Sequence, residues 1–327
     1  MADAPLARTA ARIYTPGMFP VTRCIRVAVF AALFLFPPPE ATAARTELAI
    51  LATTFPVWIF TRNVVRDCPN TRVELLVPAG SGCPHDYTLT PRDRQKLASA
   101  DVIVLNGLGL DDFLRDALPA AGDKTVEAGA ELADASGRAG STGHDGGERG
   151  QHTHEGGNPH QFSSPARAAV MTRTICEALA GRDPDNAETY RRAAEDYILR
   201  LAALARQLEK IKNRTRGRGV VVQHDSLSAL CEDAGLEQIA VVEEDGQTPS
   251  TADLVGLIGL IRSRRSAVLA CDPQYPDKIM AMLSKECGMP CINLNPAAAG
   301  PADAPLDWYE SVMQANIKTL ERHFGRP

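Results

Sequence analysis

The chain of 327 residues is long enough for one large domain or two medium ones, each with its own hydrophobic core. Its hydrophobic fraction of 44% and charged fraction of 23% are ordinary for a soluble globular protein. The formal net charge of −5 argues against a surface that binds nucleic acid or anionic membranes, so we expect no nucleic-acid partner.

The N-terminal region is typical of an export signal. Arg23 and Arg26 precede the apolar run 27–36, and residues 41–43 (Ala-Thr-Ala) place small side chains where a signal is cleaved. The run is too short to cross a bilayer as a helix, which needs about 20 residues. A membrane anchor is the alternative interpretation. We predict a cleaved signal over residues 1–43 and a periplasmic or extracytoplasmic mature protein.

The cysteine count is compatible with a disulfide. Loss of residues 1–43 removes Cys24 and leaves seven of the eight cysteines, so at least one thiol stays unpaired. Export permits disulfides, and Cys287 and Cys291, which flank a predicted helix-to-strand turn, are the best local candidates for a bridge. The alternative is that most cysteines are small buried apolar residues.

Strands and helices alternate through residues 44–183, which we expect to form an N-terminal lobe. Short apolar runs predict strands, and helical spacing or start signals predict the helices between them. Thr90 followed by Pro91, with Asp93 in the first turn, predicts a helix start. The predicted strands cover residues 47–54, 72–77, 101–105 and 125–126, and the predicted helices include 55–65, 111–117 and 164–179.

Residues 128–157 interrupt this pattern. They are rich in Gly, Ala, Ser, Asp and His and have almost no large apolar side chains, a composition that predicts a disordered loop. His144, His152 and His154 lie in it among acidic residues. Such a tract can collect metal ions weakly, which makes it an auxiliary metal site, or it is a spacer that happens to contain histidine.

One long amphipathic helix is predicted over residues 184–214. A helix of this length measures about 45 Å, roughly the length of a lobe, so it can act as a rigid link between two lobes. Its apolar residues recur at helical spacing and form a single stripe. They are Tyr190, Tyr197, Leu201, Leu204, Leu208 and Ile211.

A second alternating series over residues 215–327 predicts a C-terminal lobe. Ser250 with Asp253 predicts a helix start. Alternation of this kind is typical of parallel sheets covered by helices, so the predicted fold class is α/β with four β/α units on each side of the long helix. The predicted strands are 219–222, 238–242, 267–270 and 291–294, and the predicted helices are 225–234, 250–264, 276–286 and 307–323.

Three of the seven histidines lie where a predicted strand ends or a loop meets a helix. They are His85, His160 and His224. Neutral imidazole is a preferred zinc ligand, and three imidazoles leave one position open for water or a carboxylate. The three lie far apart in the sequence, with no zinc-finger or HExxH spacing. They either share a metal site or are unrelated surface or helix-capping residues.

Several short motifs occur along the chain in a characteristic order. They are PHDY at 84–87, T-x-x-D at 90–93, NGLGLDDFL at 106–114, NPHQF at 158–162, QHDS at 223–226 and DPQY at 272–275. With these motifs the chain resembles the metal-specific solute-binding proteins of bacterial ABC importers, and in particular the zinc-uptake (ZnuA-like) branch. The resemblance covers residues 46–322, nearly the whole mature chain. It implies two β/α lobes joined by one long rigid helix, with a metal ion in the cleft between them.

The resemblance implies that His85, His160 and His224 bind the metal. Many members add an Asp after the last strand of the second lobe, where this chain has Asn295, a poor zinc ligand. We therefore expect water near the fourth position, with Asn295 close by and Asp272 as a weaker candidate. Loss of the carboxylate argues against manganese. Asp86 and Asp225 directly follow ligands and either cap the next helix, the favoured interpretation, or orient an imidazole.

The function implied is capture of Zn²⁺ and its delivery to the membrane permease of an ABC zinc importer. We expect a monomer without enzymatic activity. A homologue of the same transport class that binds manganese or iron is the first alternative. A metal-binding surface adhesin is another. An exported zinc hydrolase is a third, but it needs a general base beside the metal-bound water, and no glutamate adjoins the three histidines.

Overall fold

The structure is a computed structural model, and the residues it describes belong to one compact unit, Thr46–Pro327. Of residues 134–136 it describes the backbone alone. The predicted signal 1–43, Cys83, Asp86 and the three loop histidines lie outside the described residues. The described ranges are 47–82, 84–85, 87–136, 158–243, 248–264 and 268–325.

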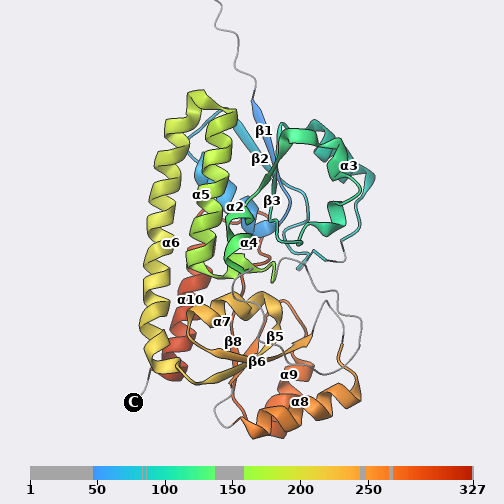
Figure 1. Ribbon diagram of the computed structural model, residues 1–327, viewed down its shortest axis with the longest axis vertical. Coiled ribbons are helices and arrows are strands. Elements are labelled where there is room, and N and C mark those ends of the chain that lie inside the picture. Colours follow the sequence, from blue (N-terminus) through green and yellow to red (C-terminus); the bar gives the residue numbers. More distant parts are fainter. Residues whose placement is uncertain are drawn as a thin grey trace, which may run out of the picture. The chain divides into compact units, whose positions relative to one another are not determined.

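Each half of this unit is built on one four-stranded, all-parallel sheet, which confirms the predicted α/β class (Figure 1). The sheets have equivalent orders, β2-β1-β3-β4 and β6-β5-β7-β8. The strands are β1 Leu48–Ala52, β2 Thr71–Leu75, β3 Val102–Leu105, β4 Thr125–Glu127, β5 Gly219–His224, β6 Glu237–Glu243, β7 Val268–Cys271 and β8 Cys291–Asn293.

The central strands β3 and β7 are buried along their whole length. Their continuous apolar sequences, VIVL and VLAC, suit strands with helices on both faces of a parallel sheet. In each sheet the strand order reverses next to the first strand, between β1 and β3 and between β5 and β7. Ligands of open parallel sheets bind beyond the carboxyl ends of the strands at such reversal points.

Helices cover both sheets. Capping boxes start α3 at Thr90 with Asp93 and α8 at Ser250 with Asp253, as predicted. The α-helices are α2 Phe55–Val65, α3 Pro91–Ser99, α4 Ala130–Ser136, α5 Pro165–Arg182, α6 Ala187–Thr215, α7 Ser228–Asp233, α8 Thr251–Ser263, α9 Lys278–Cys287 and α10 Trp308–Phe324. Short 3-10 turns are Asp112–Leu114, Leu118–Ala120, Gly122–Lys124, Gln161–Ser163, Pro184–Asn186 and Asp225–Leu227.

The predicted disordered loop starts too early. Ala128 is buried and helix α4 follows it, with Leu132 packed into the core against α5. The prediction of disorder is therefore wrong for residues 128–136, because the buried side chains of Ala128 and Leu132 anchor a short helix even where the average composition is polar. Residues 137–157 lie outside the described residues.

Helix α6 has 29 residues and a calculated length of about 44 Å. Every member of its predicted apolar stripe is buried, from Tyr190 to Ile211. The stripe contacts α2 and α5 in the first half and α7 and α10 in the second. One amphipathic face thus provides packing surface for both halves (Figure 1).

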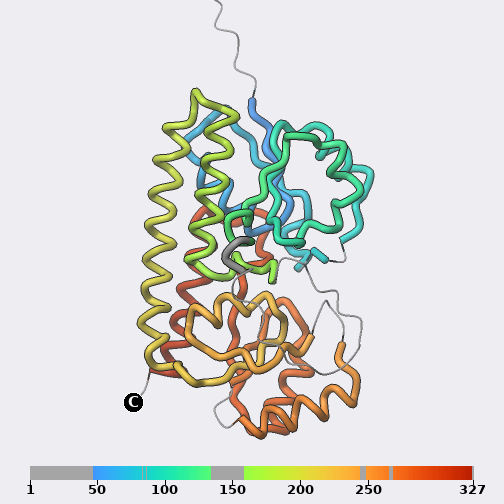
Figure 2. Tube along the Cα trace, in the orientation of Figure 1, coloured from blue at the N-terminus to red at the C-terminus, as the bar shows by residue number. Residues whose placement is uncertain are grey.

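The C-terminal part of the chain crosses back to the first half, which the sequence did not indicate (Figure 2). The amide of Gly300 donates to the carbonyl of Ala79 at 2.9 Å. On α2, Arg62 donates to the carbonyl of Ala304 at 2.6 Å and Asn63 to that of Leu306 at 2.9 Å. Residues 300–306 therefore form a second connection between the halves, in addition to α6.

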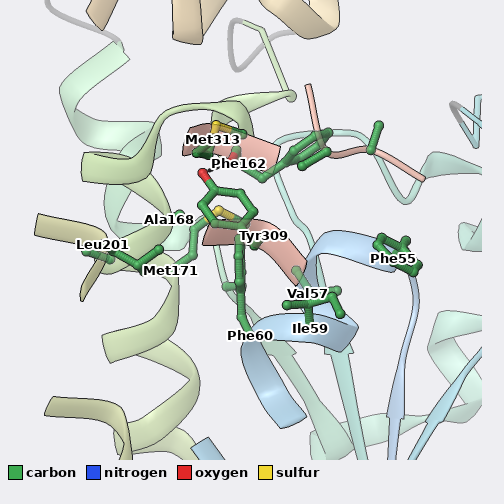
Figure 3. Packing of buried hydrophobic residues seen from close by; sticks show 14 of the residues in the cluster. Phe55, Val57, Ile59, Phe60, Phe162, Ala168, Met171, Leu201, Tyr309 and Met313 are labelled. Atoms are coloured by element: carbon green, nitrogen blue, oxygen red, sulfur yellow. Dashed lines mark hydrogen bonds between the residues drawn. The ribbon is translucent and has the colours of Figure 1, made fainter. Parts of the chain in front are cut away.

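Tyr309 on α10 completes this contact. Its ring packs edge-on against Phe60 of α2, with 5.3 Å between ring centres. Its hydroxyl donates to the carbonyl of Phe162 at 2.8 Å (Figure 3). Because Phe162 lies two residues after His160, the core of the first half and α10 together hold the segment that carries this histidine.

The predicted bridge between Cys287 and Cys291 is wrong. Cys291 is bonded to Cys271, with 6.4 Å between their Cα atoms, and Cys287 ends α9 as a free thiol. The bridge joins the neighbouring parallel strands β7 and β8. The pairing depends on β7 and β8 lying side by side, where Cys291 is opposite Leu269, two residues before Cys271. Because the two cysteines are 20 positions apart in the chain, the sequence carries no local signal for the bridge.

In the part of the chain that the structure describes, none of the helices combines the length and the apolar character that a membrane span needs.

Leu201 and Leu199 give a matched test of the α6 packing. Leu201 is fully buried, whereas Leu199 is 62% exposed on the same helix. We expect Leu201→Ala to lower the free energy of unfolding by about 2–5 kcal/mol, because it leaves a core cavity. Leu199→Ala should change it by less than about 0.5 kcal/mol. Urea unfolding followed by circular dichroism measures both, and equal losses would contradict the packing of α6.

Cys271 and Cys287 give a matched test of the disulfide. The bridge links residues 20 positions apart, so Cys271→Ser should lower the free energy of unfolding by about 3 kcal/mol through loss of loop-closure entropy. Cys287→Ser removes a free thiol and should leave stability close to that of the wild type. Peptide mapping without reductant identifies the bonded pair, and recovery of a peptide that joins Cys287 to Cys291 would refute the assignment.

Candidate metal site

The three predicted histidines come together at the strand ends. The ring centre of His160 lies 5.4 Å from that of His85 and 5.3 Å from that of His224. His160 and His224 are buried, and His85 is half-buried. Three imidazoles from three distant segments therefore lie close together, and a shared metal site stays a prediction.

Asp225 lies beside two of the three histidines. The possible ligand atoms of His160, His224 and Asp225 all lie within 4.8 Å of one another, and among the described residues no other trio of His, Cys, Asp or Glu does so. His85 adjoins this compact group rather than belonging to it. Within the described part of the chain, Asp225 is thus the acid that groups with both buried histidines.

His160 is positioned by the loop that precedes α5. The side-chain oxygen of Asn158 accepts from the His160 amide at 2.8 Å and lies 3.0 Å from its Nδ1 atom. Asn106, directly after β3, donates to the carbonyl of Pro159 at 3.0 Å. The end of a central strand therefore fixes the backbone on one side of His160, and α10 fixes it on the other through Phe162.

His224 is the last residue of β5, so the buried strand places it at the carboxyl end of the sheet. The amide of Ser226 donates to its Nδ1 atom at 3.1 Å. Its ring stacks on Tyr275 with 4.8 Å between centres and 17° between planes. A hydrogen bond on one edge and an aromatic face on one side together restrict rotation of this imidazole.

The charges around Asp225 stabilise its carboxylate form. Burial by itself raises the pKa of this acid. The hydrogen bond to His160 and the charges of His160, His224 and His85 outweigh burial and lower the pKa to about 2. An ionised carboxylate thus lies beside the imidazoles at neutral pH.

The two residues predicted near the fourth position have other partners. Asp272 follows β7 and is buried; it accepts from the Ser226 hydroxyl at 3.1 Å and the Gln274 amide at 3.0 Å. These hydrogen bonds lower the pKa of Asp272, but burial has the larger effect and raises it to about 6. The side-chain oxygen of Asn295 accepts from the Ala297 amide at 2.8 Å and so stabilises a turn.

A cavity of about 480 Å³ opens beside His85. Asp112, Phe113, Arg115 and Asp116 line the rest of it. His160 and His224 are buried, so His85 is the only one of the three candidate ligands that solvent reaches. The cavity lies next to it.

Residues 50–323 match the protein family described as "Zinc-uptake complex component A periplasmic" (ZnuA). The chain belongs to the ZnuA family. The resemblance inferred from the motifs is therefore confirmed over most of the chain.

Among similar proteins, the zinc-binding lipoprotein AdcA of Streptococcus pneumoniae is 31% identical over 304 residues, which are 90% of this chain and 60% of AdcA. The chain thus spans about three fifths of that relative's length. The high-affinity zinc uptake system protein ZnuA of Bacillus subtilis is 25% identical over 320 residues, 93% of this chain and 96% of that protein.

Two solved structures resemble the fold closely. The solute-binding protein FpvC of Pseudomonas aeruginosa in complex with Mn²⁺ has a TM-score of 0.71 and 28% identity, covering 86% of this chain and 99% of FpvC. The Zn(II)-bound ZnuA-like domain of S. pneumoniae AdcA has a TM-score of 0.66 and 26% identity, covering 86% of this chain and all of that domain.

The buried acid Asp111 stabilises the backbone just after β3, next to Asn106, which bonds the carbonyl of Pro159. Asp111 accepts from the Thr53 hydroxyl at 2.5 Å and from the Gly107 amide at 2.7 Å. Gly107 has φ +77°, a conformation that favours glycine. Burial raises the pKa of Asp111 to about 6 in spite of these hydrogen bonds.

Asp111→Asn tests this network through pH. Because the folded-state pKa of Asp111 lies above its ordinary value, its contribution to stability is full below about pH 4 and is lost as pH rises through 6. We expect the free energy of unfolding of the wild type, relative to Asp111→Asn, to fall by about 3 kcal/mol between pH 4 and 7. Urea unfolding across this range measures the difference.

The exposed neighbour Asp112, which pairs with Arg115, provides the control. Asp112→Asn should keep the pH dependence of the wild type. A constant difference between the wild type and Asp111→Asn would rule out a raised pKa at Asp111.

Proposed function

We propose that this chain is an extracytoplasmic solute-binding protein that captures Zn²⁺ and presents it to the permease of an ABC importer. One observation carries the proposal: three imidazoles from three distant segments converge, two of them buried. Family membership and the zinc-binding names of its relatives support it.

The donor set favours zinc. Imidazole nitrogen suits zinc, whereas manganese prefers carboxylate and other oxygen ligands. His85, His160 and His224 would hold the ion, and water would complete four-coordination. FpvC, with Mn²⁺ in its structure, shows that the fold also holds other divalent ions. Manganese or iron is therefore the competing cargo.

Capture follows from the arrangement of the halves. We propose that residues 44–183 and 215–327 act as two lobes, joined by the helix over 184–214, with the ion between them. His85 and His160 come from the first lobe and His224 from the second. An ion bound to both lobes stabilises their association, and separating them weakens the site and releases the ion.

The remaining features complete the proposal. Residues 1–43 would serve as a cleaved signal, and the mature protein would act as a monomer. The protein performs no reaction on its cargo, so it would not be an enzyme. His144, His152 and His154 would collect zinc weakly, a role tested by deleting residues 140–157 and counting bound ions.

Single substitutions of the three histidines test the site. We expect His85→Ala, His160→Ala and His224→Ala each to weaken zinc binding by at least about 100-fold, because each removes one of three nitrogen donors. Chelator competition on metal-stripped protein, with zinc, manganese and iron offered together, measures affinity and preference. His323→Ala, at the exposed end of α10, is the control and should bind like the wild type.

If the protein preferred manganese or iron, it would still be a solute-binding protein of the same transport class, but the assignment of zinc as its cargo would be wrong. Tight zinc binding by a variant that lacks His160 or His224 would overturn the site itself.

A further inference from the structure

The loop that follows β7 reaches the candidate ligand His224. Residues 272–276 (Asp-Pro-Gln-Tyr-Pro) include the DPQY motif, which contributes none of the three histidines. Tyr275 in this loop lies over His224, with 4.8 Å between ring centres and 17° between ring planes. These values are typical of an offset-stacked aromatic pair. The aromatic side chain of the loop therefore contacts the one candidate histidine that the second half of the fold supplies.

Gln223 fastens both ends of this loop. Its side-chain oxygen accepts from the Asp272 amide at 3.0 Å, and its side-chain nitrogen donates to the Pro276 carbonyl at 2.8 Å. Gln223 is fully buried and directly precedes His224 on β5. The strand that carries the histidine thus also holds the two ends of the loop that carries the tyrosine.

The interior of the loop is hydrogen-bonded as well. The Tyr275 amide donates to the Asp272 carbonyl at 3.1 Å, and the Gln274 amide donates to the Asp272 side chain at 3.0 Å. The second carboxylate oxygen of Asp272 accepts from the Ser226 hydroxyl at 3.1 Å, two residues after His224. Hydrogen bonds that involve no ion therefore set the position of the tyrosine ring, and a site held in this way is preorganised.

Stacking constrains the plane of the His224 ring. The last torsion of a histidine side chain is broad, so contacts with neighbours decide the orientation of the ring. The Ser226 amide bonds one point on the ring edge, Nδ1, at 3.1 Å, and Tyr275 covers one face. A metal ion binds an imidazole nitrogen in the ring plane, along the lone pair. The plane therefore sets the direction of the metal bond, whichever nitrogen receives the ion.

We propose that Tyr275, held in place by Gln223, is a positioning residue for His224: its ring keeps the imidazole plane in the orientation that zinc capture requires. The inference rests on the proposed function. Its physical basis is that a metal ligand whose orientation is fixed by packed neighbours loses less freedom when it binds the ion. Such outer partners commonly account for about 10- to 100-fold in metal affinity.

Two substitutions of Tyr275 test the proposal, since Tyr275→Leu removes the aromatic ring and Tyr275→Phe keeps it. We expect zinc affinity, measured by chelator competition, to fall about 10- to 100-fold in Tyr275→Leu and to stay within about twofold of the wild type in Tyr275→Phe. The side chain is only half-buried, so both variants should fold, which circular dichroism checks. Equal losses in the two variants would assign the effect to the hydroxyl and overturn the stacking role.

Nuclear magnetic resonance of the metal-free protein gives a readout that does not depend on zinc. The ring current of Tyr275 should shift the ring protons of His224 upfield, because they lie over its face. These signals are assigned by their loss in His224→Ala. The upfield shift should persist in Tyr275→Phe and disappear in Tyr275→Leu. A shift that is absent from the wild type, or retained in Tyr275→Leu, would show that the rings are not stacked and refute the proposal.

Phe324→Leu is the matched control. Phe324 also contacts a histidine, His323, at the far end of α10, with 4.6 Å between ring centres. This variant should keep the zinc affinity of the wild type. A loss as large as that of Tyr275→Leu would mean that removing any aromatic ring weakens binding, and the proposal would be wrong.

Gln223→Met tests the fastening of the loop, because it keeps a similar length and removes both hydrogen bonds. Zinc affinity should fall and the upfield shift of His224 should shrink. The double variant with Tyr275→Leu should lose less affinity than the sum of the two single losses, since both act through one contact. Strict additivity would contradict a shared role.

The failures of the two proposals are distinguishable. Unchanged zinc affinity in Tyr275→Leu, together with loss in His224→Ala, would refute the positioning role alone. Absence of tight zinc binding in the wild type would refute the proposed function and this inference with it.

Discussion

The contact between one carboxylate and two buried imidazoles is the interaction at the centre of the candidate site. Removing polar rings from water is unfavourable unless their nitrogens find partners. Asp225, Asn158 and the Ser226 amide supply those partners for His160 and His224. The rest of the fold brings these partners to one place, and the hydrogen bonds make the burial of the two rings tolerable.

Two long-range connections make this placement possible. Helix α6 contacts helices of both halves through one apolar face. The segment 300–306 returns to the first half through hydrogen bonds to Ala79, Arg62 and Asn63. Tyr309 then bonds the carbonyl of Phe162, close to His160. Because the halves are joined at two places, we propose that they move relative to each other by small adjustments of packed helices rather than by a wide opening.

Family membership identifies the class of protein, and the set of donor atoms at the site bears on which ion is bound. Membership of the ZnuA family and structural likeness to FpvC and AdcA establish the fold and the class of protein. The choice of ion is a matter of donor chemistry, because members with one fold hold different ions. Among the described residues, the converging groups are two buried imidazoles with the Asp225 carboxylate beside them and a third imidazole, that of His85, next to His160. That arrangement favours zinc over an ion that requires several oxygen ligands.

The sequence by itself determined what depends on local pattern. Short-range spacing predicted the buried strands, the two capping boxes and the apolar stripe of α6. Motifs singled out the three histidines. The tertiary structure decided what depends on register and distant packing: the bridge from Cys271 to Cys291, the return of residues 300–306 and the anchoring of α4. It also decided that Asp225 faces both imidazoles, because the sequence cannot show which side of a ring a carboxylate from another segment will occupy.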